Sequence, residues 1–263
     1  MKKLIFSVMV LGIAGCTTST VKDKPNMPGT YLMTSQTLLN DSARETKYTD
    51  LKQLKIYTDD FMMYVQVNPS DSVSAFGVGT YSSDTGTVTE NVIYSASNTN
   101  FVTAPHTFKL IINKTSDGYE QVIPHFVTDS QNYKLTETYQ KVGTATKTPL
   151  DGIWKEVRSY NLRGKDTLKT TRTQYKGFYN GYFMFGHTFM DSASKKHTGI
   201  GFGTFQMVND KKIKETDLNS TYSIIAGNTF DIDIEMTGTD QYKQTLTNAD
   251  GTIGVEYYER LKK

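Results

Sequence analysis

Alternation of apolar and polar residues, which is the period of a β-strand, is the dominant pattern along the chain. The segment FDIDIEM at 230–236 places four apolar side chains on one face and three acidic side chains on the other. Segments 87–94, 108–113 and 133–142 are rich in β-branched and aromatic residues. Turn signals such as DG at 117–118 separate these segments at short intervals. Beyond the N-terminus no segment keeps a helical period of apolar residues, so we expect an all-β protein.

The chain after residue 27 contains one pattern twice. GVGTY at 77–81 corresponds to GFGTF at 201–205, and the copies end alike, with ETYQK at 137–141 and EYYER at 256–260. The offset stays between about 119 and 125 residues, so the two copies are collinear. We predict two domains, residues 28–142 and 150–263, joined by a polar linker at 143–149. About eight short strands in each copy indicate a small antiparallel up-and-down barrel, a closed form that leaves no sheet edge exposed.

The first sixteen residues have the features of an export signal. A positive start, Met1 to Lys3, precedes an apolar run from Leu4 to Gly15 that ends at Cys16. The run is too short to span a membrane, which takes about 20 residues. It resembles the signal of bacterial lipoproteins, which implies a signal peptide at 1–15 and a lipid anchor on Cys16. The alternative is an ordinary secretory signal with a chance cysteine. The lipoprotein interpretation is favoured because Cys16 is the only cysteine in the chain.

Residues 16–27 are predicted to be the acylated cysteine and a flexible tether, because they are mostly small and polar. Thr17 stands where some lipoproteins carry the aspartate that retains them in the inner membrane. The resemblance therefore implies an outer-membrane protein attached through its N-terminal acyl chains. Whether it faces the periplasm or the cell surface stays open.

The second copy begins with LDGIWKEV at 150–157, which resembles the Gly-x-Trp first strand of lipocalin-type (calycin) barrels. In that family the tryptophan packs under a basic side chain of the last strand, which implies a structural pair of Trp154 and Arg260 that closes one barrel end. The corresponding pair in the first copy is Tyr31 and Lys141. The chain after the tether also resembles the tandem lipocalin-like lipoproteins of some Gram-negative bacteria. The resemblance implies a fold and no catalytic residue.

Polar residues recur at matched positions of the two copies. They form three pairs: Lys55 with Lys176, Glu90 with Glu215, and Glu137 with Glu256. One interpretation is ion pairing across strands on the barrel exterior. The other is a cavity inside one or both barrels in which these groups orient a small ligand. The apolar residues expected beside them in such a cavity are Met62, Tyr64, Phe183 and Phe185. Because 60–67 and 182–190 are apolar on both faces, the sequence leaves the inward face open.

Composition excludes several classes of function. The chain has 29 basic and 27 acidic residues, a net charge of +2, so it lacks the basic excess of a dedicated nucleic-acid binder. One cysteine excludes an internal disulfide framework and a thiolate zinc cluster. The four histidines have no metal-ligand spacing, and no nucleophile motif is present. We expect no cofactor, no metal site and no catalytic residue.

The two copies differ in charge. Residues 27–142 carry eight basic and twelve acidic groups, whereas residues 150–263 carry sixteen basic and fourteen acidic groups. Seven of the basic residues cluster early in the second copy: Lys155, Arg158, Arg163, Lys165, Lys169, Arg172 and Lys176. The cluster is either a solvated face or a docking site for an anionic partner. The opposite signs favour distinct partners or ligands for the two halves.

These observations predict a membrane-anchored, non-enzymatic protein whose barrels bind a small apolar or amphipathic ligand. The alternative is an interaction module with filled barrels that binds protein or glycan at the surface or in the periplasm. A ligand-sized cavity among the matched polar and aromatic residues would separate the two.

Overall fold

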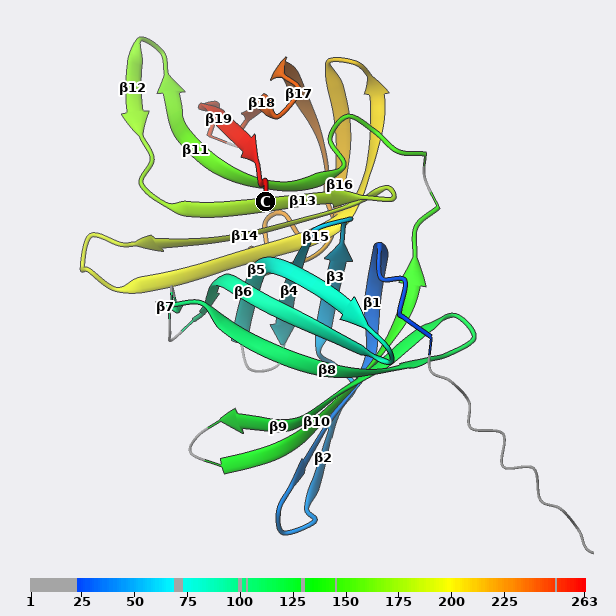
Figure 1. Cartoon of the computed structure of the whole chain (residues 1–263). Helices are drawn as coiled ribbons and strands as arrows, with labels where there is room; N and C mark the ends of the chain where they lie inside the picture. The colour runs from blue at the N-terminus through cyan, green and yellow to red at the C-terminus, as the bar shows by residue number, and fades with distance from the viewer. Residues whose placement is uncertain are drawn as a thin grey trace, which may run out of the picture.

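The computed structural model describes residues 23–68, 73–98, 101–102, 104–128, 131–144, 146–248 and 250–263. Within these ranges the chain forms nineteen β-strands and no helix (Figure 1). No helix in the described part of the chain is long and apolar enough to cross a membrane. The predicted signal peptide and the anchor Cys16 lie outside the described residues.

The first copy folds into a closed antiparallel barrel. Its eight strands, in order around the barrel, are β1 (Gly29–Asn40), β3 (Lys52–Tyr57), β4 (Phe61–Asn68), β5 (Val73–Asp84), β6 (Thr87–Ser97), β8 (His106–Lys114), β9 (Gly118–Thr128) and β10 (Gln131–Val142). Pairing of β10 with β1 closes the sheet. Two short strands extend it: β2 (Glu45–Tyr48) pairs with β1, and β7 (Phe101–Val102) pairs with β6.

The second copy repeats this topology. Its eight strands are β11 (Gly152–Arg163), β13 (Thr173–Tyr179), β14 (Tyr182–Met190), β15 (Lys196–Asn209), β16 (Lys212–Ser220), β17 (Thr229–Gly238), β18 (Gln241–Thr247) and β19 (Ile253–Arg260). Pairing of β19 with β11 closes the barrel, and the short β12 (Asp166–Lys169) extends β11.

The closing ladders of the two barrels match in register. The β1–β10 pairing shifts between Met33 and Ser35, and the β11–β19 pairing shifts at the corresponding place, between Glu156 and Arg158. A bulge bends a strand and re-aims the side chains beyond it, so both barrels bend alike at this point. The structure confirms the expected fold class of two tandem antiparallel up-and-down barrels, the architecture that the lipocalin resemblance implies.

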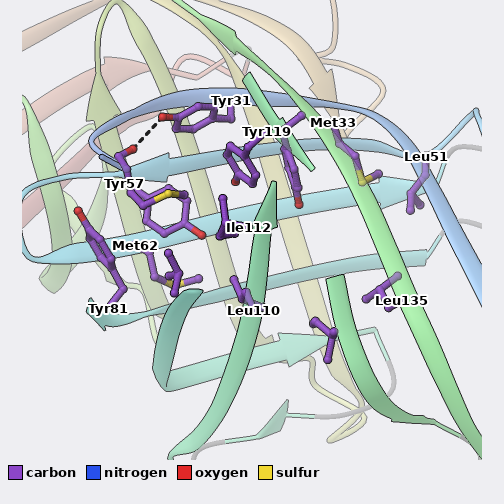
Figure 2. Close-up of a cluster of buried hydrophobic side chains, with 14 residues drawn as sticks. Tyr31, Met33, Leu51, Tyr57, Met62, Tyr81, Leu110, Ile112, Tyr119 and Leu135 are labelled. Carbon is purple, nitrogen blue, oxygen red and sulfur yellow. Dashed lines mark hydrogen bonds between the residues drawn. The ribbon is translucent and has the colours of Figure 1, made fainter. Parts of the chain in front are cut away.

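Three apolar cores hold the molecule together. One fills the interior of barrel 1, where Tyr31, Tyr57, Met62 and Tyr119 pack together (Figure 2). A second lies inside barrel 2 around Trp154. The third lies between the barrels and joins outward-facing residues of β3, β4 and β5 to residues of β11, β13, β14 and β15. In Figure 1 these two groups of strands face each other across the centre of the molecule.

The third core explains why β4 and β14 are apolar on both faces. On β4, Met62 points into barrel 1, whereas its neighbour Met63 points outward into the core between the barrels. On β14, Phe183 points inward and Met184 points outward in the same way. Each strand is therefore buried on two sides, and a strand buried on both faces loses the polar alternation of a half-exposed one.

Glycine allows the two barrels to approach closely. A Cβ atom at Gly186 on β14 would lie 2.4 Å from the ring of Phe76, which projects from β5 of barrel 1. Polar contacts flank this point: the Tyr94 hydroxyl lies 2.7 Å from the Thr188 hydroxyl, and Thr198 donates to the carbonyl of Ser97 at 2.7 Å. The two barrels thus share a packed, hydrogen-bonded interface.

The packed part of the chain begins before β1. Met27, which the sequence assigns to the end of the tether, is buried in the core of barrel 1, and its carbonyl accepts a hydrogen bond from the Tyr31 hydroxyl at 2.9 Å. The amide of Gly86 donates to the carbonyl of Asp23 at 3.2 Å. Methionine is the one large apolar residue in this segment, and its burial draws residues 23–27 against the barrel.

Truncation of Phe76 to alanine tests the core between the barrels. The ring is fully buried, so its loss should cost about 3–5 kcal/mol in the free energy of unfolding. Chemical denaturation followed by circular dichroism measures this value. The control Val208→Ala removes a half-exposed side chain on β15 and should change stability by less than about 0.5 kcal/mol. Equal effects of the two variants would contradict the shared core.

Candidate functional site in the second barrel

The three matched polar pairs lie inside the barrels and not on their exterior. Lys55 and Glu90 form an ion pair at 2.9 Å in barrel 1, and Lys176 and Glu215 form one at 2.6 Å in barrel 2. All four side chains are at most 6% exposed. A buried charge is tolerated only when it is paired and hydrogen-bonded, so each pair must belong to a wider polar network.

In barrel 1 that network crosses the interior. Lys55 also donates to Gln121 at 3.2 Å, and Gln121 donates to Glu137 at 2.5 Å. The Tyr139 hydroxyl donates to the same carboxylate at 2.9 Å. Glu90 accepts a further hydrogen bond from the Tyr57 hydroxyl. Strands β3, β6, β9 and β10 each contribute a member.

Barrel 2 repeats the Lys–Gln–Glu–Tyr part of this network with the matched residues, whereas Phe178 replaces Tyr57 and offers Glu215 no hydroxyl. Lys176 donates to Gln244 at 3.1 Å, Gln244 donates to Glu256 at 2.7 Å, and the Tyr258 hydroxyl donates to Glu256 at 2.5 Å. Because the connectivity is conserved between the copies, we assign this network to the common fold and seek function where the copies differ.

The tryptophan and tyrosine pairs named from the sequence are adjacent at one barrel end. The guanidinium of Arg260 lies 4.0 Å from the ring centroid of Trp154, and the ammonium of Lys141 lies 5.9 Å from that of Tyr31. Arg260 also donates to the carbonyl of Pro149 at 2.8 Å. Cation–π stacking and main-chain hydrogen bonds give these residues a structural role at that end.

The opposite end of barrel 2 holds a cavity of about 340 Å³. Its position follows from the register, since β11 runs from Trp154 at the closed end to Asn161, which lines the cavity opposite Gly254. The polar lining includes Arg172, Gln174, Lys176, Asp217, Gln244 and Glu256. The apolar lining includes Phe185, Phe230, Ile232 and Leu246. The volume is within the range of small-ligand sites, at its lower end.

The structure divides the predicted ligand residues between the two barrels. Phe185, Glu215 and Glu256 line the cavity of barrel 2. Phe183 lies deeper in the core of that barrel. The remaining four belong to the interior of barrel 1: Met62, Tyr64, Glu90 and Glu137.

The two barrels differ at the cavity end. Matched positions carry apolar residues in barrel 1 and polar residues or glycine in barrel 2. On the strands these are Met33 and Glu156, Leu38 and Asn161, Val92 and Asp217, and Leu135 and Gly254. Leu51 and Arg172 form a fifth pair, each one residue before β3 and β13. In barrel 1 Val92 is fully buried, and the other four side chains belong to or pack against the apolar interior, as Met33, Leu51 and Leu135 do in Figure 2. Replacement of a leucine by Gly254 removes a side chain from the wall of barrel 2.

The predicted basic cluster is also divided. Its last two members, Lys176 and Arg172, point into barrel 2, where Arg172 forms ion pairs with Glu156 at 2.6 Å and with Glu256 at 2.5 Å. Burial opposes the charge of Arg172, but Glu256 and Glu156 outweigh it and raise its pKa. The other five residues are exposed on β11, β12 and the turn between them: Lys155, Arg158, Arg163, Lys165 and Lys169.

Asp217 is one of the cavity residues that the sequence prediction missed, and it is the acidic one. Its side chain is 3% exposed, and its Oδ1 atom has no hydrogen-bond partner among the described residues. Burial, and then the negative charge of Glu215, raise the pKa of Asp217 to about 7, although Lys176 acts in the opposite direction. Two features of the sequence could have identified Asp217. It lies on the same face of β16 as Ile213 and Glu215, and the position matched to Asp217 in the first copy is the apolar Val92.

A loop from the wall reaches over the cavity mouth. Tyr222, between β16 and β17, places its hydroxyl 2.6 Å from Nε2 of His187, whose Nδ1 lies 2.9 Å from the side-chain oxygen of Gln174. Burial and the nearby charge of Arg172 lower the pKa of His187 to about 4, so the ring is neutral at pH 7. A neutral ring with Nδ1–H directed to Gln174 accepts the Tyr222 hydrogen at Nε2.

Among the described residues no three histidine, cysteine, aspartate or glutamate side chains are grouped as metal ligands require. Comparison with known protein families finds no match, and no curated protein matches the sequence. The class of protein defined here is thus a tandem eight-stranded β-barrel protein, in which barrel 2 has an open polar-and-apolar cavity.

Replacement of Asp217 by asparagine should stabilise the protein at pH 8. The pKa of Asp217 is about 7 in the fold against an ordinary value of 3.8, so the folded state binds the proton more tightly and loses stability as the pH rises between these values. The asparagine variant lacks this loss. Its advantage in urea unfolding should grow from near zero at pH 4 to about 2–4 kcal/mol at pH 8.

The matched control is Asp231→Asn, which removes an exposed acid from β17 and should shift stability by less than about 0.5 kcal/mol at every pH. An advantage of Asp217→Asn that does not vary with pH would contradict the buried, raised-pKa carboxyl.

Proposed function

We propose that the protein is a lipid-anchored outer-membrane lipoprotein whose second barrel binds a small amphipathic ligand without converting it. The observation that carries the binding function is the cavity of about 340 Å³ at the open end of barrel 2. Small-molecule sites are concave and mostly apolar, with a few placed polar groups that set orientation. The cavity has both parts: Phe230, Ile232 and Leu246 supply an apolar wall, and Arg172 and Asp217 supply polar groups.

Comparison of the two copies supports a binding function for barrel 2. The buried Lys–Glu network and the aromatic end pairs occur in both barrels and serve the fold. The cavity end differs, because leucine at positions 38 and 135 corresponds to Asn161 and Gly254. Substitutions that remove core volume are destabilising, so their presence is best explained by a requirement for space.

An interaction function is the second candidate, and two observations favour it, one in each barrel. The interior of barrel 1 carries large apolar side chains where barrel 2 has the cavity. Five exposed basic residues on β11, β12 and their turn offer a separate surface for an anionic partner.

Filling the cavity tests the binding function. The double variant Asn161→Leu, Gly254→Leu gives barrel 2 the residues of barrel 1 at these positions. A Cβ atom at Gly254 would contact Leu246 and Asn161 at 3.3–3.4 Å, so a leucine there occupies cavity space. We expect the neutral fluorescent probe N-phenyl-1-naphthylamine to bind the natural protein and to lose at least about tenfold in affinity for the variant.

The control Val157→Leu enlarges a half-exposed side chain on the outside of β11 and should leave probe affinity unchanged. Mass spectrometry of organic extracts from the natural protein and the double variant then identifies bound molecules. Absence of probe binding to the natural protein, together with empty extracts, would overturn the binding function.

The anchor has its own test. Cys16→Ala removes the only thiol that the lipoprotein signal can acylate, so the variant should lose its acyl chains and leave the membrane fraction. Each buried methylene of an acyl chain contributes about 0.8 kcal/mol to membrane attachment, so the change in fractionation should be near complete. Ser19→Ala in the tether is the control. Unchanged membrane fractionation of Cys16→Ala would reject the lipid anchor.

A further inference from the structure

We propose that the cavity of barrel 2 selects an amphipathic molecule with a protonated amine, which binds at the carboxylate of Asp217. The inference rests on the proposed binding function and adds the chemical class of the ligand.

The first support is the state of the carboxylate itself. Asp217 lines the cavity, is 3% exposed, and has an Oδ1 atom without a hydrogen-bond partner among the described residues. It forms no ion pair with any lysine, arginine or histidine in the described part of the chain. A buried polar atom without a partner costs free energy, and a ligand N–H directed at this oxygen removes the cost.

The second support is the charge at the inner end of the cavity, called the cavity floor here, where the charged side chains of the lining gather. Lys176 is paired with Glu215, and Arg172 is shared by Glu156 and Glu256. With Asp217 added, the floor holds more carboxyl groups than cations. A ligand cation corrects this imbalance, whereas a ligand carboxylate increases it. Low-dielectric surroundings make both effects larger than in water.

The third support comes from the first barrel, which serves as an internal comparison. Val92 occupies the position of Asp217 there and is fully buried. The Lys55–Glu90 pair forms in barrel 1 without a second acid at this position. The fold therefore has no need of Asp217, and a buried acid that the fold does not need is a candidate for ligand recognition.

The apolar wall sets the other half of the ligand. Phe230, Ile232 and Leu246 line the cavity from β17 and β18, and Ile224 on the loop at the mouth lines it while remaining 76% exposed. An apolar body that contacts these residues buries hydrocarbon and places its amine toward the floor. A cavity of about 340 Å³ suits a small amphiphile better than a long-chain lipid.

Three probes of equal chain length separate the head groups: octylamine, octanol and octanoate, titrated at pH 8 by isothermal calorimetry. At this pH an alkyl amine is protonated, since ammonium groups of this type lose their proton near pH 10.4. We expect octylamine to bind at least about tenfold more tightly than octanol, with octanoate weakest, as a charge-assisted hydrogen bond to a buried carboxylate requires.

Asp217→Asn keeps the shape of the side chain and removes its charge, and it should abolish the preference for octylamine while octanol still binds. Asp231→Asn makes the same change of charge on the exposed face of β17 and should retain the full preference. Asp217→Val, which restores the residue of the first copy, is the second variant and should behave as Asp217→Asn does.

The outcomes distinguish the two proposals. If octanol and N-phenyl-1-naphthylamine bind but octylamine has no advantage, or if its advantage survives in both Asp217 variants, the amine inference is overturned and the binding function stands. If none of these probes binds the natural protein, the amine inference is overturned, and the binding function fails as well when the organic extracts are also empty.

Discussion

A buried lysine–glutamate pair at the centre of each barrel is the constraint on which the rest of the structure depends. Removing a charge from water is costly, and the cost is offset only when every remaining donor and acceptor has a partner. Lys55 and Lys176 each have two partners, on β6 and β9 in one barrel and on β16 and β18 in the other. Because these partners come from strands distant in the chain, the network holds the register of the closed sheet. A strand shifted by one residue would turn its charged member outward.

Much of this architecture could be predicted from the residues, because strand alternation and collinear duplication are local patterns. The doubled GxG segments, the matched lysines and glutamates, and the aromatic–basic end pairs all identify one fold present twice. The inward face of β4 and β14 could not be predicted, since each strand is buried on both sides and only the partner barrel distinguishes Met62 from Met63. Asp217 could not be predicted from the matched residues for a related reason: repetition in the sequence identifies positions where the copies agree, and the cavity lies where they differ.

The two barrels share one backbone fold but differ in the side chains of their interiors. The shared network and the bulge near Met33 and Glu156 fix the backbone, which leaves the far end of each barrel free to change its side chains. In barrel 1 that end is packed with leucine and methionine side chains. In barrel 2 it contains the cavity, which is lined by charged residues and by the carboxyl of Asp217, whose Oδ1 has no hydrogen-bond partner among the described residues. The two barrels thus differ in the polarity of their interiors as well as in their total charge.

The core between the barrels has a consequence for the history of the duplication. Phe76 of barrel 1 packs against Gly186 of barrel 2. Each barrel by itself would therefore expose apolar side chains to water on this face. A gene fragment that encodes one barrel would expose a broad apolar sheet face, which promotes self-association. The two barrels must therefore be encoded together in one gene. Each barrel can diverge in sequence only at surfaces that the other barrel does not cover.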